Sequence, residues 1–289
     1  MSNEAGTDLS GAFRALEEKA GGRLGAYVLD TQTGLGSGWR IDERFAHCSS
    51  FKLSLAAMFL SRAERGDVDL GEVLRWSEAD IMPNSDYSRK HVGKGATIED
   101  LSRATLVYSD NTAANVLLRR AGGPQQLTGF WRSLGDEVSR LDRLEPQLNE
   151  TPAGSEMDTT TPAAMAATVA KMVHGNALGQ QARETLRGWM IEVETGARRI
   201  RAGLPKDWIA GDKTGTGMGE KRHTYVDLAF AGPKGRAPLI IASYYEPVLP
   251  KDTESMNPAA EAVLAEVGRI AAASLAAPSV ALLGGLEVV

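Results

Sequence analysis

Segments with the pattern of β-strands lie at both ends of this 289-residue chain, and most of what lies between them has the pattern of helices. Near the start, residues 24–30 and 36–41 flank the turn-forming sequence Thr31-Gln32-Thr33-Gly34, which predicts a hairpin. Near the end, residues 208–217, 224–231 and 238–245 alternate or run apolar, with a turn at Gly232-Pro233-Lys234-Gly235. Since strands joined by short turns pair antiparallel, we expect both ends of the chain to meet in one antiparallel sheet.

The helix-like segments form two groups. Residues 9–19 and 258–275 precede and follow the strands, and we expect these two helices to pack on the sheet. The other group begins with a helix start at Thr97-Ile98-Glu99-Asp100 and continues with residues 111–120, 124–134, 161–175 and 182–193. Residues 140–158 show no clean period and predict a long loop, which in a compact domain usually serves a function.

The predicted fold class is therefore α/β (α+β), a single domain with two lobes. The sheet lobe covers about residues 1–45 and 195–276, the helical lobe covers about residues 46–194, and residues 277–289 form a tail without an assigned element. We expect the active site in the cleft between the lobes.

Composition excludes several classes of protein. A chain that is 43% hydrophobic can bury a large core, and a net charge of −5 with interspersed acids and bases argues against a nucleic-acid partner. No window approaches the roughly 20 apolar residues of a membrane span, and the first residues as written carry neither the basic start nor the apolar run of an export signal. Cys48 is the only cysteine, so no internal disulfide is expected, and the four histidines lack the spacing of metal ligands.

A polar corner runs into a mostly apolar helix at residues 45–60, and there Ser49 stands three residues before Lys52. Residues three apart share one face of a helical turn, so the two side chains should meet. A lysine partly withdrawn from water can lose its charge and accept the serine proton, which makes the serine a nucleophile. Because Ser-x-x-Lys occurs by chance about once in a chain of this length, the motif needs support from others.

Two further motifs carry hydroxyl groups. Ser109-Asp110-Asn111 lies between two predicted helices and offers a hydroxyl for proton relay and an amide that can donate and accept, although an ordinary helix cap is the commoner use of this sequence. Lys213-Thr214-Gly215, followed by Thr216, lies in a predicted strand. There a cation and hydroxyls can line the strand edge while the glycine admits a ligand, and a hairpin bend is the alternative.

The predicted long loop contains Arg143-Leu144-Glu145-Pro146-Gln147-Leu148-Asn149. Glu145 and Asn149 are near enough in sequence to hold one water together, and a solvated glutamate before a turn proline is the alternative. Arg199 is an ordinary surface arginine unless the strand register turns it toward Lys213.

Taken together and in this order, these motifs closely resemble those of the class A serine β-lactamases over nearly the whole chain: Ser49-x-x-Lys52, Ser109-Asp110-Asn111, Glu145-Pro146-x-x-Asn149 and Lys213-Thr214-Gly215. Arg140-Leu141-Asp142-Arg143 and Asp158-Thr159-Thr160-Thr161-Pro162 also look like that family, in which an Arg–Asp ion pair closes the loop. The resemblance implies that Arg143 and Asp158 are structural rather than catalytic.

The resemblance implies hydrolysis of the β-lactam ring of penicillins and cephalosporins through a serine acyl-enzyme, without a cofactor, and hence antibiotic resistance. Ser49 would attack the lactam carbonyl, with the backbone N–H groups of Ser49 and Thr216 as the oxyanion hole. Lys52, or Glu145 through a water, would take the serine proton. Ser109, assisted by Lys213, would pass a proton to the departing ring nitrogen.

The resemblance also implies how the substrate is bound and released. Lys213, Thr214, Thr216 and Arg199 would hold the substrate carboxylate beside Gly215, and Asn111 would bind the acylamino side chain. Glu145 with Asn149 would activate the water that hydrolyses the acyl-enzyme. The family further implies a periplasmic or secreted monomer whose partners are small β-lactams and neither nucleic acid nor a membrane.

Two positions depart from the common pattern of the family. Asn84 stands where these enzymes often carry an aromatic residue at the cleft mouth, although Tyr87 can take that place if the loop is rearranged. Gly217 stands where some members carry the cysteine that bridges to a cysteine placed like Cys48, so that bridge cannot form in this chain.

Two other functions use the same nucleophile. One is a penicillin-binding DD-peptidase, and the other is a β-lactam sensor that is acylated once and then signals. Both would lack a carboxylate for deacylation, so Glu145 in its loop argues against them. A sensor would also be expected to adjoin a membrane segment.

Overall fold

The computed structural model describes residues 8–152, 154–219, 222–248 and 256–276. The unassigned tail, residues 277–289, and the first seven residues, on which the expectation about an export signal depends, lie outside the described residues. None of the helices described is both long and apolar enough to cross a membrane.

The helices follow the predicted order along the chain, with one addition, the short α3. They are α1 (Ser10–Ala20), α2 (Phe51–Glu64), α3 (Asp86–Lys90), α4 (Ile98–Val107), α5 (Asn111–Ala121), α6 (Gln125–Ser133), α7 (Pro162–Val173), α8 (Gln180–Glu192) and α9 (Pro258–Ala276). The predicted start signals lie where they should: the side chain of Thr97 accepts the N–H of Asp100 at the start of α4, and Pro162 opens α7.

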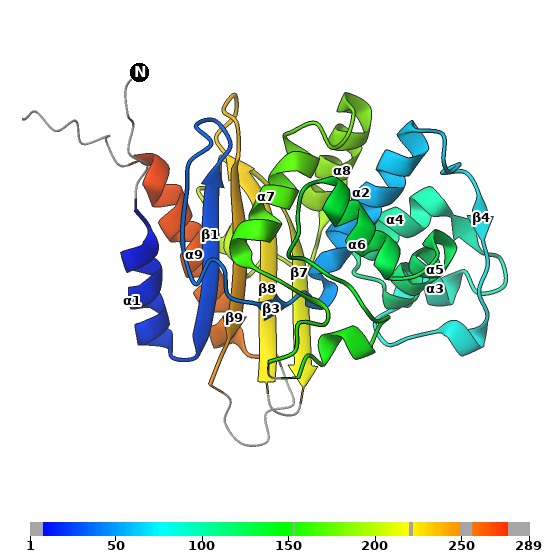
Figure 1. Ribbon diagram of the computed structural model, residues 1–289, viewed down its shortest axis with the longest axis horizontal. Helices are drawn as coiled ribbons and strands as arrows, with labels where there is room; N and C mark the ends of the chain where they lie inside the picture. Colours follow the sequence, from blue (N-terminus) through cyan, green and yellow to red (C-terminus); the bar gives the residue numbers. More distant parts are fainter. Residues whose placement is uncertain (1–7, 153, 220–221, 249–255, 277–289) are drawn as a thin grey trace, which may run out of the picture.

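The predicted antiparallel sheet is confirmed. Its strands are β1 (Arg23–Asp30), β2 (Gly36–Trp39), β7 (Ile209–Gly219), β8 (Arg222–Gly232) and β9 (Leu239–Glu246), in the order β2-β1-β9-β8-β7. β1 pairs with β9 along its whole length, so the two ends of the chain lie side by side (Figure 1). β7 forms one edge of the sheet, and an edge strand leaves alternate backbone groups free for other partners.

The terminal helices α1 and α9 cover one face of the sheet (Figure 1). Apolar side chains from both helices and from that face of the strands form one buried cluster, which includes Phe13, Leu24, Ile241, Leu264 and Val267. Burial of this apolar surface attaches both helices to the sheet, as the sequence predicted.

The other helices lie on the opposite side of the sheet, with α7 and α8 packed against its strands. α2 lies at the centre of this larger cluster, and every residue from Phe51 to Ser61 is buried. A helix that is surrounded by packing on all sides fixes the position of whatever precedes its first turn. α7 packs on the sheet although it falls within the predicted helical lobe. The lobe boundaries remain a prediction.

Two short strand pairs were missed by the sequence analysis. β3 (Phe45–Ala46) pairs with β6 (Thr159–Thr160), and β4 (Val73–Leu74) pairs with β5 (Ala96–Thr97). Two residues are too few to show an alternating pattern. The first pair matters for the site, since it joins the chain just before Ser49 to the end of the long loop.

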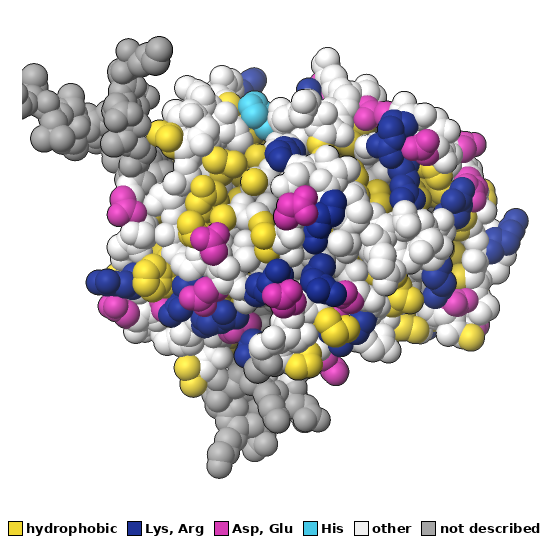
Figure 2. All heavy atoms as spheres, in the orientation of Figure 1, with side chains coloured by type: hydrophobic (Ala, Val, Ile, Leu, Met, Phe, Trp, Pro, Cys, Tyr) yellow, Lys and Arg dark blue, Asp and Glu magenta, His cyan; other side chains and the backbone are white. Residues whose placement is uncertain are grey.

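Charges of both signs are spread over the surface. Figure 2 shows Lys and Arg side chains interspersed with Asp and Glu on one face. Many of them form ion pairs, such as Arg120 with Glu72 and Arg236 with Asp30.

Candidate active site

Ser49 lies in a single 3-10 turn, Cys48–Ser50, that leads directly into α2. Cys48 has a φ of 46°, in the left-handed region, and the Ser50 hydroxyl donates to the carbonyl of His47 at 2.7 Å. Lys52 follows in the first turn of α2 with its Nζ 2.9 Å from Ser49 Oγ. The spacing therefore brings the two side chains together, as predicted.

Lys52 is fully buried and surrounded by oxygen atoms. Its Nζ lies 3.0 Å from Glu145 Oε1 and 2.9 Å from the carbonyl oxygen of Ser109, and it also donates to Asn111 Oδ1. Burial lowers the pKa of Lys52, and the Glu145 carboxylate opposes this shift. Glu145 Oε1 is also 3.2 Å from Ser49 Oγ, so two groups that could act as bases contact the Ser49 hydroxyl.

Ser109 lies between α4 and α5 with a φ of 57°. Its Oγ accepts a hydrogen bond from Lys213 Nζ at 3.1 Å and lies 3.4 Å from Lys52 Nζ. The helix-cap alternative is also correct, for the neighbouring residue: Asp110 accepts the N–H of Ala113 at 2.8 Å and so caps α5. One tripeptide thus supplies a cap and two side chains that face the lysines.

Lys213 lies inside β7, so the hairpin-bend alternative is wrong. The side chain is fully buried, and burial, followed by the nearby charge of Lys52, lowers the pKa of Lys213 well below its usual range. A Cβ at Gly215 would lie 2.8 Å from the His47 carbonyl oxygen and 2.9 Å from Ser50 N. Gly215 therefore leaves room for the turn that holds Ser49, whereas the sequence analysis assumed that it leaves room for a ligand.

Glu145 is held from both sides within the long loop. Asn149 Nδ2 donates to Glu145 Oε2 at 2.6 Å, and among the described residues the buried Asn149 Oδ1 has no hydrogen-bond partner. Asn115 accepts the N–H of Glu145 at 3.0 Å and donates to its carbonyl oxygen at 2.9 Å. The sequence analysis missed Asn115, because an asparagine inside α5 carries no motif.

The loop is closed at its base as the resemblance implied. Arg143 Nε lies 2.6 Å from Asp158 Oδ2, and Asp158 Oδ1 accepts the N–H groups of Asp142 and Arg143. The carbonyl of Asp158 accepts the N–H of His47 at 3.0 Å. The end of the loop is thus attached to the chain two residues before Ser49.

Arg199 is only 2% exposed, so the surface-arginine alternative is wrong. Its guanidinium donates to the carbonyl oxygens of Gly215 and Val226, both at 2.8 Å, and to Thr216 Oγ1 at 2.7 Å. The arginine therefore braces the strand edge that follows Lys213. Arg199 lies in the segment before a short 3-10 turn, where the sequence shows no periodic pattern.

Two buried carboxyl groups that the sequence analysis missed lie next to this edge. Asp212 and Asp227 are fully buried and lie on the same face of adjacent strands, since Thr214 pairs with Asp227. Burial raises the pKa of Asp227 and raises that of Asp212 well above its usual range. Arg201 Nη2 lies 3.1 Å from Asp212 Oδ1, although its direction is too oblique for a hydrogen bond.

Asn84 and Tyr87, which the sequence analysis compared for the cleft mouth, make different contacts. Asn84 Nδ2 donates to the carbonyl oxygen of Ser109 at 2.9 Å, and its own carbonyl accepts the N–H of Asn111 at 3.1 Å. The ring of Tyr87 stacks on that of His91, with ring centres 4.2 Å apart. Both residues line a cavity of about 370 Å³ beside the Ser109 turn.

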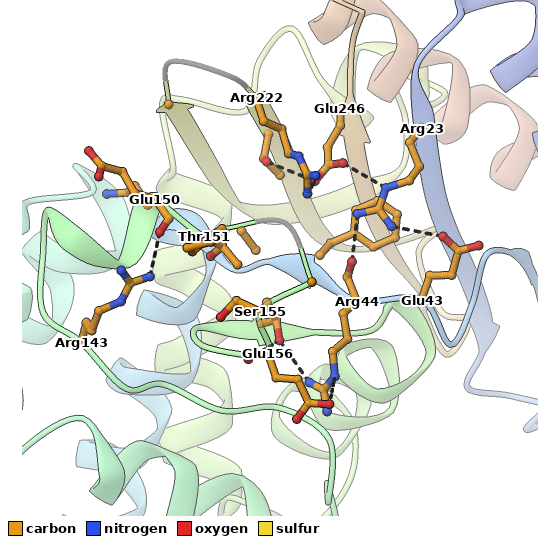
Figure 3. Close-up of a pocket in the computed structure, with 18 residues that line it drawn as sticks. Arg23, Glu43, Arg44, Arg143, Glu150, Thr151, Ser155, Glu156, Arg222 and Glu246 are labelled. Carbon is orange, nitrogen blue, oxygen red and sulfur yellow. Dashed lines mark hydrogen bonds and ion pairs between the residues drawn. The ribbon is translucent and has the colours of Figure 1, made fainter.

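A larger cavity, of about 1020 Å³, lies between the long loop and the ends of the strands (Figure 3). Its arginines already have partners: Arg23 contacts Glu43 and Glu246, and Arg143 donates to the carbonyl of Glu150. None of the five predicted catalytic side chains lines it. Within the described residues, no three His, Cys, Asp or Glu side chains are grouped so that they could hold a metal ion.

Comparisons with known proteins agree with this geometry. Residues 8–275 match the model of the β-lactamase enzyme family. The chain is 46% identical to β-lactamase L2 of Stenotrophomonas maltophilia over 90% of this chain and 83% of the relative, and 42% identical to β-lactamase CTX-M-8 of Citrobacter amalonaticus over 82% and 81%. Among solved structures, an ancestral class A β-lactamase matches with a TM-score of 0.84 at 47% identity, over 91% of this chain and 98% of the other.

Proposed function

This chain belongs to the class A serine β-lactamases, and on that premise we propose a role for each side chain of its site. The protein hydrolyses the β-lactam ring through an acyl-enzyme on a serine, which gives resistance to β-lactam antibiotics. One observation carries the assignment of the roles: Ser49 Oγ lies 2.9 Å from Lys52 Nζ and 3.2 Å from Glu145 Oε1. A hydroxyl between a buried amine and a carboxylate is placed to lose its proton as it attacks.

Acylation begins with the attack of Ser49 Oγ on the lactam carbonyl. Lys52 or Glu145 takes the hydroxyl proton, and both are within reach of it. The backbone N–H groups of Ser49 and Thr216 form the oxyanion hole. Thr216 lies on β7, the edge strand, where alternate N–H groups have no strand partner.

Cleavage of the ring leaves a nitrogen that needs a proton. Ser109 Oγ gives it this proton and is resupplied by Lys52, while Lys213 stabilises the hydroxyl by its hydrogen bond at 3.1 Å. A hydroxyl that contacts both amines can pass a proton on without moving far.

Substrate binding uses the same strand edge. Lys213, Thr214 and Thr216 hold the substrate carboxylate, Arg199 positions Thr216 and contributes its charge, and Gly215 keeps this edge close to Ser49. Asn111 binds the acylamino side chain through its amide.

Deacylation depends on Glu145 and Asn149. Glu145 acts as the general base for a water that attacks the ester carbonyl, and the free Asn149 Oδ1 accepts a hydrogen bond from that water. This step separates a hydrolase from a DD-peptidase or a sensor, which stay acylated by β-lactams. We also propose that the enzyme acts as a periplasmic or secreted monomer on small β-lactams, without a cofactor or nucleic acid.

Replacing Glu145 tests the division of roles. Glu145→Ala should still be acylated by a penicillin but should lose the base for hydrolysis, so acyl-enzyme accumulates as a mass adduct on Ser49. Intact-protein mass spectrometry during turnover measures this adduct. Unchanged turnover would contradict the role of Glu145.

Two variants serve as controls. Glu150→Ala removes an exposed carboxylate of the same loop and should leave turnover unchanged. Ser49→Ala should show neither adduct nor turnover, and hydrolysis retained by this variant would refute the nucleophile.

A further inference from the structure

The cavity of about 370 Å³ beside the Ser109 turn adjoins the proposed carboxylate-binding edge. Val107 and Tyr108, which precede Ser109 directly, form part of its wall. Thr195 lines the cavity and shares a hydrogen bond with Thr214, whose Oγ1 lies 2.6 Å from Thr195 Oγ1. A substrate whose carboxylate lies at Thr214 would therefore extend its neighbouring substituent toward this cavity.

Two tyrosines give the cavity aromatic walls that neighbouring side chains hold in place. Tyr87 stacks on His91, and the hydroxyl of Tyr108 accepts a hydrogen bond from Arg103 at 3.2 Å. Tyr108 remains 39% exposed, so its ring is available to a ligand. Fixed aromatic side chains provide flat contact area at low entropic cost.

The charges around the cavity favour a cation. Asp86 and Glu194 contribute two exposed carboxylates and Lys90 one ammonium group. Among the described residues, none of these three has an ion-pair partner within 4 Å. Arg103 is also close, with its guanidinium carbon 5.6 Å from the centre of the Tyr108 ring, and it is paired with Glu192. The balance of free charge is negative, and aromatic rings also attract cations.

We propose that this cavity is a specificity site for cephalosporins that carry a cationic aromatic substituent, such as a pyridiniomethyl group, on the ring carbon next to the one bearing the carboxylate. The inference rests on the proposed function, because the carboxylate bound at Lys213 and Thr214 sets the direction of the substituent. Glu194 and Asp86 attract the cation, Tyr87 and Tyr108 contact its ring, and Lys90 reduces the attraction.

Two cephalosporins with the same thienylacetamido side chain test the proposal, one with a pyridiniomethyl and one with an acetoxymethyl substituent. The measurement is the ratio of their kcat/KM values, pyridiniomethyl over acetoxymethyl, for the full chain at low ionic strength. Glu194→Gln and Asp86→Asn should each lower this ratio about 1.5- to 5-fold, the range of one exposed ion pair. Lys90→Gln should raise it by a similar factor, and added salt should reduce all three effects.

Glu184→Gln is the matched control, since it removes an exposed carboxylate that lines neither cavity, and it should leave the ratio unchanged. A ratio that none of the three cavity variants changes, or that rises for Glu194→Gln and Asp86→Asn or falls for Lys90→Gln, overturns this inference while hydrolysis of both substrates upholds the proposed function. If the wild-type enzyme hydrolyses a penicillin but neither cephalosporin, this inference fails and the proposed function stands; if it hydrolyses none of the three, both fail. Because the three residues are exposed, each variant should fold, and circular dichroism checks this.

Discussion

Lys52 and Lys213 are both fully buried, and both contact the hydroxyl of Ser109. Burial lowers the pKa of each lysine, and the charge of Lys52 lowers that of Lys213 further. Glu145 acts in the opposite direction on Lys52. A hydroxyl between two amines of reduced basicity can exchange protons with either, as the relay proposed for Ser109 requires.

Asn115 holds the backbone of Glu145 through two hydrogen bonds, and we expect these bonds to position the Glu145 carboxylate for deacylation. Asn115→Ala removes both hydrogen bonds to the Glu145 backbone and leaves a buried N–H and carbonyl without partners. The free energy of unfolding should fall by about 1–3 kcal/mol. Because Glu145 is then less well placed, deacylation should slow by about 10- to 100-fold, whereas acylation should change less.

Rapid-quench mass spectrometry separates the two steps for Asn115→Ala, and thermal unfolding gives the loss of stability. Gln147→Ala, an exposed change in the same loop, should alter neither. A destabilised Asn115→Ala enzyme that deacylates at the wild-type rate would show a structural role only.

For single residues, the sequence predicts a contact between two side chains where their spacing within one element sets the distance between them. Ser49 and Lys52 meet because three residues of helix separate them. Asn115 and Glu145 lie thirty residues apart, and Arg199 reaches strands that follow it in the chain. No local pattern encodes such contacts. Asn115 therefore went unrecognised, and Arg199 was placed in the site only by the resemblance to the family.

Among the elements, β7 and the turn that holds Ser49 are in close contact along their backbones. Gly215 and Gly217 face this turn, where a Cβ at Gly217 would lie 2.9 Å from Cys48 Sγ. In a disulfide, the Cβ of one cysteine lies about 3 Å from the sulfur of the other. The backbone at Gly217 is therefore already placed for a disulfide with Cys48, and only the cysteine side chain at position 217 is absent.

Gly217→Cys should form a disulfide with Cys48 when the protein is refolded in a glutathione redox buffer. The bridge would close a long loop, for which chain entropy sets an upper limit of about 5 kcal/mol, so the oxidised variant should melt at a higher temperature than its reduced form. Thiol titration under denaturing conditions and thermal unfolding with and without reductant measure the two effects.

Gly217→Ala places the same Cβ against Cys48 and Asn149 without a bond, so it isolates the steric cost. Two free thiols after oxidative refolding of Gly217→Cys would contradict the geometry.

Long elements were predictable and short ones were not. The sheet strands and terminal helices show several periods of their pattern, and their turns carry glycine and proline at the expected places. β3 and β6 have two residues each and exist because the loop returns to the start of α2. The tertiary contact, rather than local propensity, makes these strands.

Across the whole molecule, the site draws on segments from every part of the chain. Ser49 precedes the central helix, Ser109 joins two others, Glu145 lies in a loop and Lys213 on the sheet edge. The sheet itself joins the first strands to the last. Loss of folding therefore takes the whole site apart at once.

The paired carboxyl groups of Asp212 and Asp227 should make stability depend on pH in an unusual direction. An aspartate in the unfolded chain loses its proton near pH 3.9, whereas in the folded protein burial raises the pKa of both groups. Between these values the folded state holds more protons than the unfolded state, so stability is full at low pH and falls as the pH rises toward the folded pKa. For one proton the slope is at most about 1.4 kcal/mol per pH unit.

Asp212→Asn removes this proton uptake, so its unfolding free energy should fall less steeply than that of the wild type from about pH 4.5 upward. Chemical denaturation at intervals between pH 4.5 and 8 measures both slopes.

Lys213, Arg199 and Arg201 also face the pair, and the lowered pKa of Lys213 contributes in the opposite direction at higher pH. Because the Asp212 carboxylate raises the pKa of Lys213, the variant also alters the contribution of the lysine, so the slopes are compared at the acidic end of this range. The exposed change Asp207→Asn should leave the wild-type slope intact. Parallel curves for Asp212→Asn and the wild type would mean that the pair holds no extra proton in the folded enzyme.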